Sequence, residues 1–264
     1  LTKLLKCVDW DEPLEVSAAR QIVGRWAPVD VSDLIELLST QFVATAPWVR
    51  EFAVAGLAER ASDGELLSYL LPLVQAVQYE KALPLPPAAA PLAAFLISRA
   101  ARNAEIANFF AWYLAVERAD ERHGDHYEEV HAALWAELDR MRAGKAVKET
   151  LVRQQQLVAR ISAAAASLKA SKEARPQKMA KLRAMFDSGG ELDSVRSFHA
   201  PLPLPLDPNV RVLGSLSHKA RIFKSAMQPL GIAFATAPPE DTAALAAAAA
   251  SASQRGWRAE YAVI

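Results

Sequence analysis

Apolar side chains recur at helical spacing through residues 13–188, and this periodicity disappears after Ser188, where Gly189 and Gly190 follow. Beyond that point prolines cluster, and β-branched and aromatic residues alternate along the chain. A spacing near 3.6 residues is typical of helices that bury one face, whereas alternation is typical of strands. The sequence therefore predicts a mainly α fold, in which an armadillo-like stack of helices is followed by a part that is built of strands.

Start signals for helices divide the first part into successive segments. Pro13 and Asp30 stand at positions that favour a helix N-terminus, and Ser62 with Glu65 has the spacing of a capping box. The later helices are expected at about 91–101, 103–121, 124–142, 146–170 and 174–187. Short connections between them predict antiparallel neighbours. Pro72 falls inside the helix that begins near Ser62, and its missing N–H predicts a kink there.

The second part has a different organisation. The expected segments are a helical domain at 1–188, a Pro-rich linker at 189–209 and a second domain at 210–264, with strands at 210–214 and 231–236, a loop at 223–229 between them, and a third strand from Tyr261. Residues 237–256 are interpreted as a low-complexity insertion between the second and third strands, either flexible or weakly helical.

Charge is balanced overall but distributed unevenly. Residues 1–140 hold 21 acidic and 12 basic side chains, whereas residues 145–186 hold 10 basic and 2 acidic ones. The basic residues that recur near helical spacing are Lys169, Lys172, Arg175, Lys178, Lys181 and Arg183. This basic face is open to three interpretations: contact with an anionic membrane, contact with an acidic partner subunit, or a solvated helix surface. No nucleic-acid-binding motif accompanies it, so we expect no nucleic-acid partner.

Few features point to metal, disulfide or membrane chemistry. Cys7 is the single cysteine, which excludes an internal disulfide and a cysteine-based zinc site. His123, His126 and His131 are clustered but lack the spacing of a zinc pair, so we expect them to be polar surface residues. No uncharged apolar stretch reaches 18 residues, and we expect no transmembrane segment. The chain also has no initiator Met and begins within an apolar pattern, so we expect a piece of a longer protein.

Aromatic residues in the first part follow helical spacing. The set comprises Trp10, Trp26, Trp48, Phe109, Phe110, Trp112, Tyr113 and Trp135. Residues of this size at this spacing are typical of a packed core rather than of a ligand box. We therefore expect these side chains to be core residues.

Ordered motifs in both parts point to one family. Asn108–Leu114 reads Asn-Phe-Phe-Ala-Trp-Tyr-Leu, Pro201–Pro208 alternates Pro and Leu before Asp-Pro, and Phe223–Met227 reads Phe-Lys-Ser-Ala-Met. Together with Arg153–Val158, this set resembles the class III phosphatidylinositol 3-kinases, the vacuolar protein-sorting lipid kinases of eukaryotes. The resemblance implies a helical accessory (PIK) domain followed by the first strands of a kinase small lobe of the PI3K/PI4K type.

The resemblance also implies an activity. Members of this family transfer the γ-phosphate of ATP to the 3-hydroxyl of phosphatidylinositol with Mg²⁺ or Mn²⁺, in autophagy and in endosomal or vacuolar trafficking. It implies a membrane substrate, a protein-kinase-like regulatory subunit and a Beclin-type subunit as partners. It further implies a cytoplasmic protein that is peripheral on endosomal or autophagic membranes.

For the nucleotide, the resemblance implies a role for the loop between the first two strands and for the end of the sequence. The implied ATP-contacting residues are Phe223, Lys224, Ser225, Ala226, Met227 and, against the adenine, Ile264. Backbone N–H groups and the Ser225 hydroxyl are suitable donors to phosphate oxygens. By its residues alone the loop fits neither glycine-rich phosphate motif, and an ordinary hairpin loop stays open.

We identify no catalytic residue and no metal ligand in the sequence. The resemblance places the ATP lysine, the catalytic loop and the metal-binding loop beyond Ile264, so we expect the 264 residues alone to be inactive. The alternative is a non-catalytic helical scaffold or interaction protein that is derived from this kinase.

Overall fold

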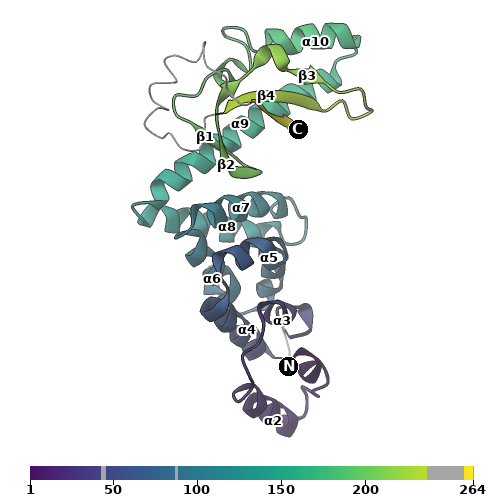
Figure 1. The fold of residues 1–264 in the computed structure, drawn as a ribbon. Helices are drawn as coiled ribbons and strands as arrows, with labels where there is room; N and C mark the ends of the chain where they lie inside the picture. The colour runs from purple at the N-terminus through teal and green to yellow at the C-terminus, as the bar shows by residue number, and fades with distance from the viewer. Residues whose placement is uncertain (43–45, 87–88, 237–258, 264) are drawn as a thin grey trace. The chain divides into compact units, whose positions relative to one another are not determined.

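The computed structural model describes residues 1–42, 46–86, 89–236 and 259–263 (Figure 1). The chain separates into two compact units, Leu1–Lys148 and Glu149–Ile264. The first unit is helical, and the second combines helices with an antiparallel sheet. This arrangement confirms the predicted fold class, a mainly α chain in which a stack of helices is followed by a part that is built of strands.

Helices make up the first unit. In chain order they are α1 (Thr2–Lys6), α2 (Pro13–Val23), α3 (Val31–Glu36), η1 (Thr40–Phe42), α4 (Pro47–Arg60), α5 (Asp63–Ala76), η2 (Val77–Ala82), α6 (Pro91–Ala100), α7 (Ala104–Glu117), α8 (Gly124–Arg140) and the start of α9 (Gly144–Ala170). The consecutive helices α6 and α7, and α7 and α8, contact each other, as their short connections predict, and α7 also packs against α5.

Local start signals fix several of these helices. At the start of α5 the Glu65 N–H donates to Ser62 Oγ at 3.2 Å, and the Ser62 N–H donates to Glu65 Oε2 at 2.9 Å, which confirms the capping box. Asp30 precedes α3 as predicted, but its side chain makes no capping hydrogen bond. Helix α5 continues through Pro72, whose side chain is exposed, and the kink there stays a prediction.

A buried ion pair lies inside the first unit. Arg50 of α4 is 1% exposed and Glu80 of η2 is 1% exposed. The Arg50 guanidinium donates to the carbonyl oxygens of Leu38 and Ala76 at 2.7 and 2.8 Å, and its Nε lies 3.4 Å from Glu80 Oε1. Burial lowers the pKa of Arg50, and the negative charge of Glu80 opposes that effect.

The predicted environment of the histidines is wrong at His126. This side chain is 5% exposed and its Nε2 lies 3.1 Å from the Val77 carbonyl oxygen. His123 is partly exposed and pairs with Asp120 at 3.1 Å, while His131 packs on the ring of Trp135. His126 and Tyr127 lie on the inner face of α8. The buried residues Val130, Leu134 and Leu138 continue this face at helical spacing, which is why both side chains point inward.

The aromatic side chains divide between core and surface. Phe110 is fully buried, and Trp10 and Trp48 are partly buried: the ring centroid of Trp10 lies 5.9 Å from that of Phe42 and 6.2 Å from that of Trp48. Trp26 is 44% exposed, so its predicted place in the core is wrong. It stands in the connection that follows α2, where helical spacing no longer directs a side chain inward.

The second unit contains the sheet. Its elements are the rest of α9, α10 (Arg175–Ala184), η4 (Asp193–Val195), β1 (Leu202–Leu204), β2 (Asp207–Ser215), η5 (Ser217–Lys219), β3 (Arg221–Ile222), β4 (Leu230–Thr236) and β5 (Ala259–Val263). The strand order is β1-β2-β4-β3, with β5 also paired to β4, and all pairs are antiparallel. Strands β2, β4 and β5 fulfil the three predicted strands.

Two predictions about the second part need correction. The predicted Pro-rich linker at 189–209 contains η4 and β1, because Leu202 pairs with Val212 and is 1% exposed in the core. The loop at 223–229 follows the additional short strand β3 rather than β2 directly. The predicted insertion at 237–256 and residue 264 lie outside the described residues.

The core of the second unit includes residues from both helices. Leu157, Ile161 and Leu168 of α9 cluster with Leu182 of α10 and with sheet residues such as Ile232. This packing is why the compact division falls at Lys148 and Glu149, whereas the sequence places the domain boundary at 188 and 189. Which segments fold on their own stays a prediction.

Candidate functional site

The loop between β3 and β4 forms a closed hairpin. The Phe223 N–H donates to the Pro229 carbonyl at 3.0 Å, and the Gln228 N–H donates to the Ser225 carbonyl at 3.1 Å. Gln228 adopts a positive φ of 50°, a left-handed conformation that non-glycine residues rarely adopt. These bonds close the base of the hairpin and leave its tip exposed.

The tip presents several donors to solvent. Lys224, Ser225, Ala226 and Met227 are exposed, and Met227 is 69% exposed. Among the described residues, no hydrogen-bond acceptor is recorded for the backbone N–H groups of Lys224, Ala226 and Met227. Three free N–H groups with a serine hydroxyl and a lysine fit the chemistry of an anion-binding turn.

Helix α10 holds the base of this loop. Arg175 Nη2 donates to the Ile222 carbonyl at 2.7 Å, and Lys178 Nζ donates to Gln228 Oε1 at 3.0 Å. The Ile222 N–H in turn donates to the sulfur of Met179 at 3.3 Å. Strand β3, which precedes the loop, and Gln228 near the end of the loop are therefore both hydrogen-bonded to α10.

An aromatic residue fixes the entry to the loop. The Arg221 guanidinium carbon lies 4.7 Å from the Phe223 ring centroid, a cation–π contact. A Cβ added at Gly231 would lie 2.8 Å from Phe223 Cε2, so only glycine lets the ring lie against β4. Phe223 is therefore an anchor of the loop rather than a free side chain.

The structure thus brings five of the six predicted site residues together. Phe223, Lys224, Ser225, Ala226 and Met227 share one hairpin, whereas Ile264 lies outside the described residues. Their role in binding ATP stays a prediction.

Sequence reasoning missed the support beneath the loop. It assigned Arg175 and Lys178 to a basic surface, but Lys178 is 6% exposed and bonded to Gln228, so that interpretation is wrong for Lys178. The signal was present, since Lys178, Leu182 and Met185 are spaced i, i+4 and i+7 and form the buried face of α10.

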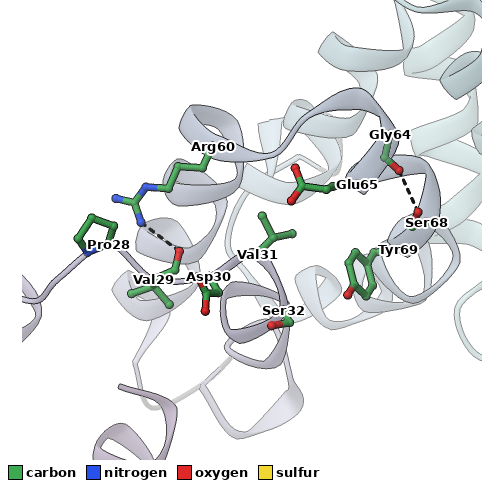
Figure 2. Close-up of a pocket in the computed structure, with 10 residues that line it drawn as sticks. All are labelled: Pro28, Val29, Asp30, Val31, Ser32, Arg60, Gly64, Glu65, Ser68 and Tyr69. Atoms are coloured by element: carbon green, nitrogen blue, oxygen red, sulfur yellow. Dashed lines mark hydrogen bonds between the residues drawn. The ribbon is translucent and has the colours of Figure 1, made fainter.

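A larger hollow lies in the first unit, between the start of α3 and the helices α4 and α5 (Figure 2). Its volume is about 660 Å³. Figure 2 shows that its polar groups bond to one another: Arg60 donates to the Val29 carbonyl at 3.1 Å, and Ser68 donates to the Gly64 carbonyl at 3.0 Å. Glu65, which also lines it, is held in the capping box. The first contact joins α4 to the segment that precedes α3, and the other two lie within α5 and its N-terminal cap, so these polar groups have structural partners.

The described residues contain neither a candidate metal site nor a candidate membrane-spanning helix. No group of three or more His, Cys, Asp or Glu side chains in that part of the chain is placed to hold a metal ion. Across the same residues, none of the helices combines the length and the apolar character that a membrane crossing needs.

Comparisons with known proteins agree with this architecture. The sequence profile of the phosphoinositide 3-kinase family accessory domain (PIK domain) matches residues 1–146. The chain is 37% identical over 236 residues to phosphatidylinositol 3-kinase pik3 of Schizosaccharomyces pombe, with 89% of this chain and 29% of that protein covered. It is 35% identical over 247 residues to phosphatidylinositol 3-kinase VPS34 of Arabidopsis thaliana, with 91% of this chain and 29% of that protein covered.

A helical accessory domain joined to the opening strands of a kinase small lobe defines a protein of the lipid-kinase class. The chain belongs to the phosphoinositide 3-kinase family, and its similarity to relatives named VPS34 agrees with a class III member. It spans less than a third of the length of these curated relatives, since 29% of each is covered.

Proposed function

We propose that this chain is part of a lipid kinase that transfers the γ-phosphate of ATP to the 3-hydroxyl of phosphatidylinositol. The observation that carries the proposal is a match that runs through both units, 37% identical over 236 residues, to a relative named phosphatidylinositol 3-kinase. The proposed setting is autophagy and endosomal or vacuolar trafficking, on the cytoplasmic surface of those membranes. The proposed partners are a protein-kinase-like regulatory subunit and a Beclin-type subunit.

In this proposal the first unit is a scaffold and the β3–β4 loop contacts ATP. Phosphoryl transfer depends mainly on positioning and on neutralising charge. The exposed N–H groups of Lys224, Ala226 and Met227 and the Ser225 hydroxyl suit phosphate oxygens. Bound Mg²⁺ or Mn²⁺ would supply charge neutralisation at those phosphates, and the metal ligands are expected outside the 264 residues.

The test is a lipid kinase assay on the product of the complete open reading frame and on the 264 residues alone. Vesicles of phosphatidylinositol with ATP and Mg²⁺ or Mn²⁺ are incubated with each protein, and the phosphorylated inositol position is determined by chromatography of the deacylated lipid. We expect 3-phosphorylated lipid from the complete product and none from the 264 residues. A complete product that forms no such lipid would favour the alternative, a non-catalytic helical scaffold.

The loop is tested in the same assay by replacing Ser225 with Ala. A hydrogen bond to a charged group contributes about 1.5–3 kcal/mol, so we expect the KM for ATP to rise about tenfold. Ser162→Ala, at an exposed position of α9, is the matched control. Equal KM values for the two variants would remove Ser225 from the proposed site.

A further inference from the structure

A small hollow in the second unit combines cationic and hydroxyl side chains with apolar ones in its lining. It lies between α9 and the segment 194–202 and has a volume of about 170 Å³. Its polar lining includes Arg153, Arg160, Ser194, Ser197 and His199. Among the described residues that line it there is no carboxylate.

Helix geometry places the two arginines on the same face. Arg153 and Arg160 are seven residues apart in α9, which is two turns and about 10.5 Å of rise. Leu157 lies between them, is 5% exposed and belongs to the core of the second unit. This face of α9 therefore lies next to the residues that pack on the sheet. Two long guanidinium side chains at this spacing can reach a common anion from opposite ends.

The two arginines differ in how firmly they are held. Arg153 Nη2 donates to the Ala200 carbonyl at 2.6 Å, and this bond fixes the side chain at the hollow while its other donors remain. Arg160 is exposed, and no hydrogen-bond or ion-pair partner is recorded for it among the described residues. One arginine is therefore positioned in advance, and the other is available to a ligand.

Asp193 directly precedes the lining residue Ser194 in the sequence, and its carboxylate already has partners outside the hollow. Asp193 accepts a hydrogen bond from the Gly189 N–H at 3.0 Å and lies 3.6 Å from Arg196. Residues 149–264 carry 15 basic and nine acidic side chains, so the unit as a whole favours an anion. Nothing in the lining therefore neutralises the two guanidinium groups.

We propose that this hollow binds a phosphate group, either inorganic phosphate or a phosphate monoester on an inositol ring. A volume of about 170 Å³ corresponds to roughly five or six water molecules, which accommodates one tetrahedral oxyanion. Guanidinium groups donate paired hydrogen bonds that match phosphate oxygens, and the Ser194 and Ser197 hydroxyls supply further donors. No residue of this site belongs to the β3–β4 loop.

Calorimetric titration of the complete 264-residue chain with inorganic phosphate at low ionic strength tests the proposal. We expect saturable binding that weakens at least tenfold in Arg160→Gln, because a charge-assisted bidentate contact is lost. Arg160 is exposed, so the substitution leaves the core intact. Arg183→Gln, at an exposed position of α10, is the charge-matched control and should bind as the unchanged chain does.

Two further titrations complete the experiment. The first shows whether phosphate binds at this hollow or at the β3–β4 loop, and the second shows whether the natural ligand is inorganic phosphate or an inositol phosphate. Lys224→Gln alters the loop and should leave the titration unchanged if the hollow is the site. Tighter binding of inositol 1,3-bisphosphate than of inorganic phosphate would identify an inositol head group, and equal binding would identify the free anion. The proposal is wrong if phosphate does not bind, or if Arg160→Gln and Arg183→Gln bind it equally.

Discussion

At the scale of single residues, the contacts of Arg50 and Glu80 bear most directly on stability. Glu80 receives hydrogen bonds from the backbone N–H groups of Leu92 and Ala93 at 2.8 and 3.0 Å, at the start of α6. Arg50 binds carbonyl oxygens at the ends of α3 and α5. The pair therefore satisfies orphan backbone groups at three helix ends that water does not reach.

Replacing Glu80 by Gln should destabilise the first unit strongly. Removing one partner of a buried ion pair leaves an uncompensated charge and costs about 3–5 kcal/mol. Urea unfolding followed by circular dichroism measures this loss. Glu51→Gln, an exposed position of the same helix as Arg50, should change the unfolding free energy by less than about 0.5 kcal/mol. A loss below about 1 kcal/mol for Glu80→Gln would show that the Leu38 and Ala76 carbonyl oxygens alone are sufficient to stabilise the Arg50 charge.

The buried His126 predicts a pH dependence. Burial is the main cause that lowers the pKa of His126 below its ordinary value near 6.5, against the opposing effects of Val77 and Glu80. At a pH between the two pKa values, the unfolded chain binds a proton at His126 and the folded chain does not. The neutral His126 therefore makes its full contribution to the stability of the fold above the pKa of the unfolded chain. It is lost as the pH falls from about 6.5 through the lowered folded value.

Thermal unfolding at pH 7.5 and pH 5.5 measures this effect. We expect a lower midpoint at pH 5.5, and a smaller difference between the two pH values in His126→Gln, which carries no titrating group. His123→Gln is the control, because His123 is partly exposed and pairs with Asp120. An unchanged difference in His126→Gln would assign the pH dependence to other groups, such as His131, whose pKa burial also lowers.

At the scale of elements, α10 determines the conformation of the β3–β4 loop. Gln228 holds a left-handed conformation that costs about 1–2 kcal/mol for a residue with a side chain. The bond from Lys178 to the Gln228 side chain stabilises that conformation. Because the same helix binds Ile222, loop and helix form one supported unit.

Replacing Lys178 by Met should therefore loosen the loop while it preserves the apolar packing of the side chain. Loss of a charge-assisted hydrogen bond of about 1.5–3 kcal/mol predicts a rise of at least tenfold in amide exchange at Phe223 and Gln228. Hydrogen exchange followed by nuclear magnetic resonance gives both rates. Lys181→Met, at an exposed position of α10, should leave them unchanged. Equal exchange in the two variants would show that the hairpin bonds alone hold the loop.

The elements themselves were largely predictable, and their partners were not. Periodicity and caps located α5 through α10 because these signals are local, as Ser62 and Glu65 illustrate. Apolar neighbours at helical spacing indicate the buried face of α8 and of α10, but the side chains of Lys178 and His126 are polar and do not by themselves indicate burial. Strand β1 was missed because Pro203 within it and the prolines on either side suppress the strand pattern, although Leu202 pairs with Val212.

At the scale of the whole molecule, the core of the second unit decides where the chain divides. Met185 and Phe186 of the predicted helical domain are 6% and 2% exposed, and they cluster with Leu230 and Phe234 of β4. A polypeptide of residues 1–188 lacks the sheet, so these apolar groups would keep only the members of the cluster in α9 and α10 and would lose those contributed by the strands.

We therefore predict that residues 1–148 fold cooperatively by themselves and that residues 149–188 add nothing to that transition. Polypeptides of 1–148 and 1–188 should unfold at the same temperature, and in the longer one the amides of 157–186 should exchange as fast as those of an unstructured chain. Cooperative unfolding of 1–188 with protected amides at Leu182 and Met185 would instead support the boundary that the sequence places at residue 188. The contacts between α9 and α10 would then be sufficient to keep both helices folded without the sheet, so protection at those two positions decides between the two boundaries.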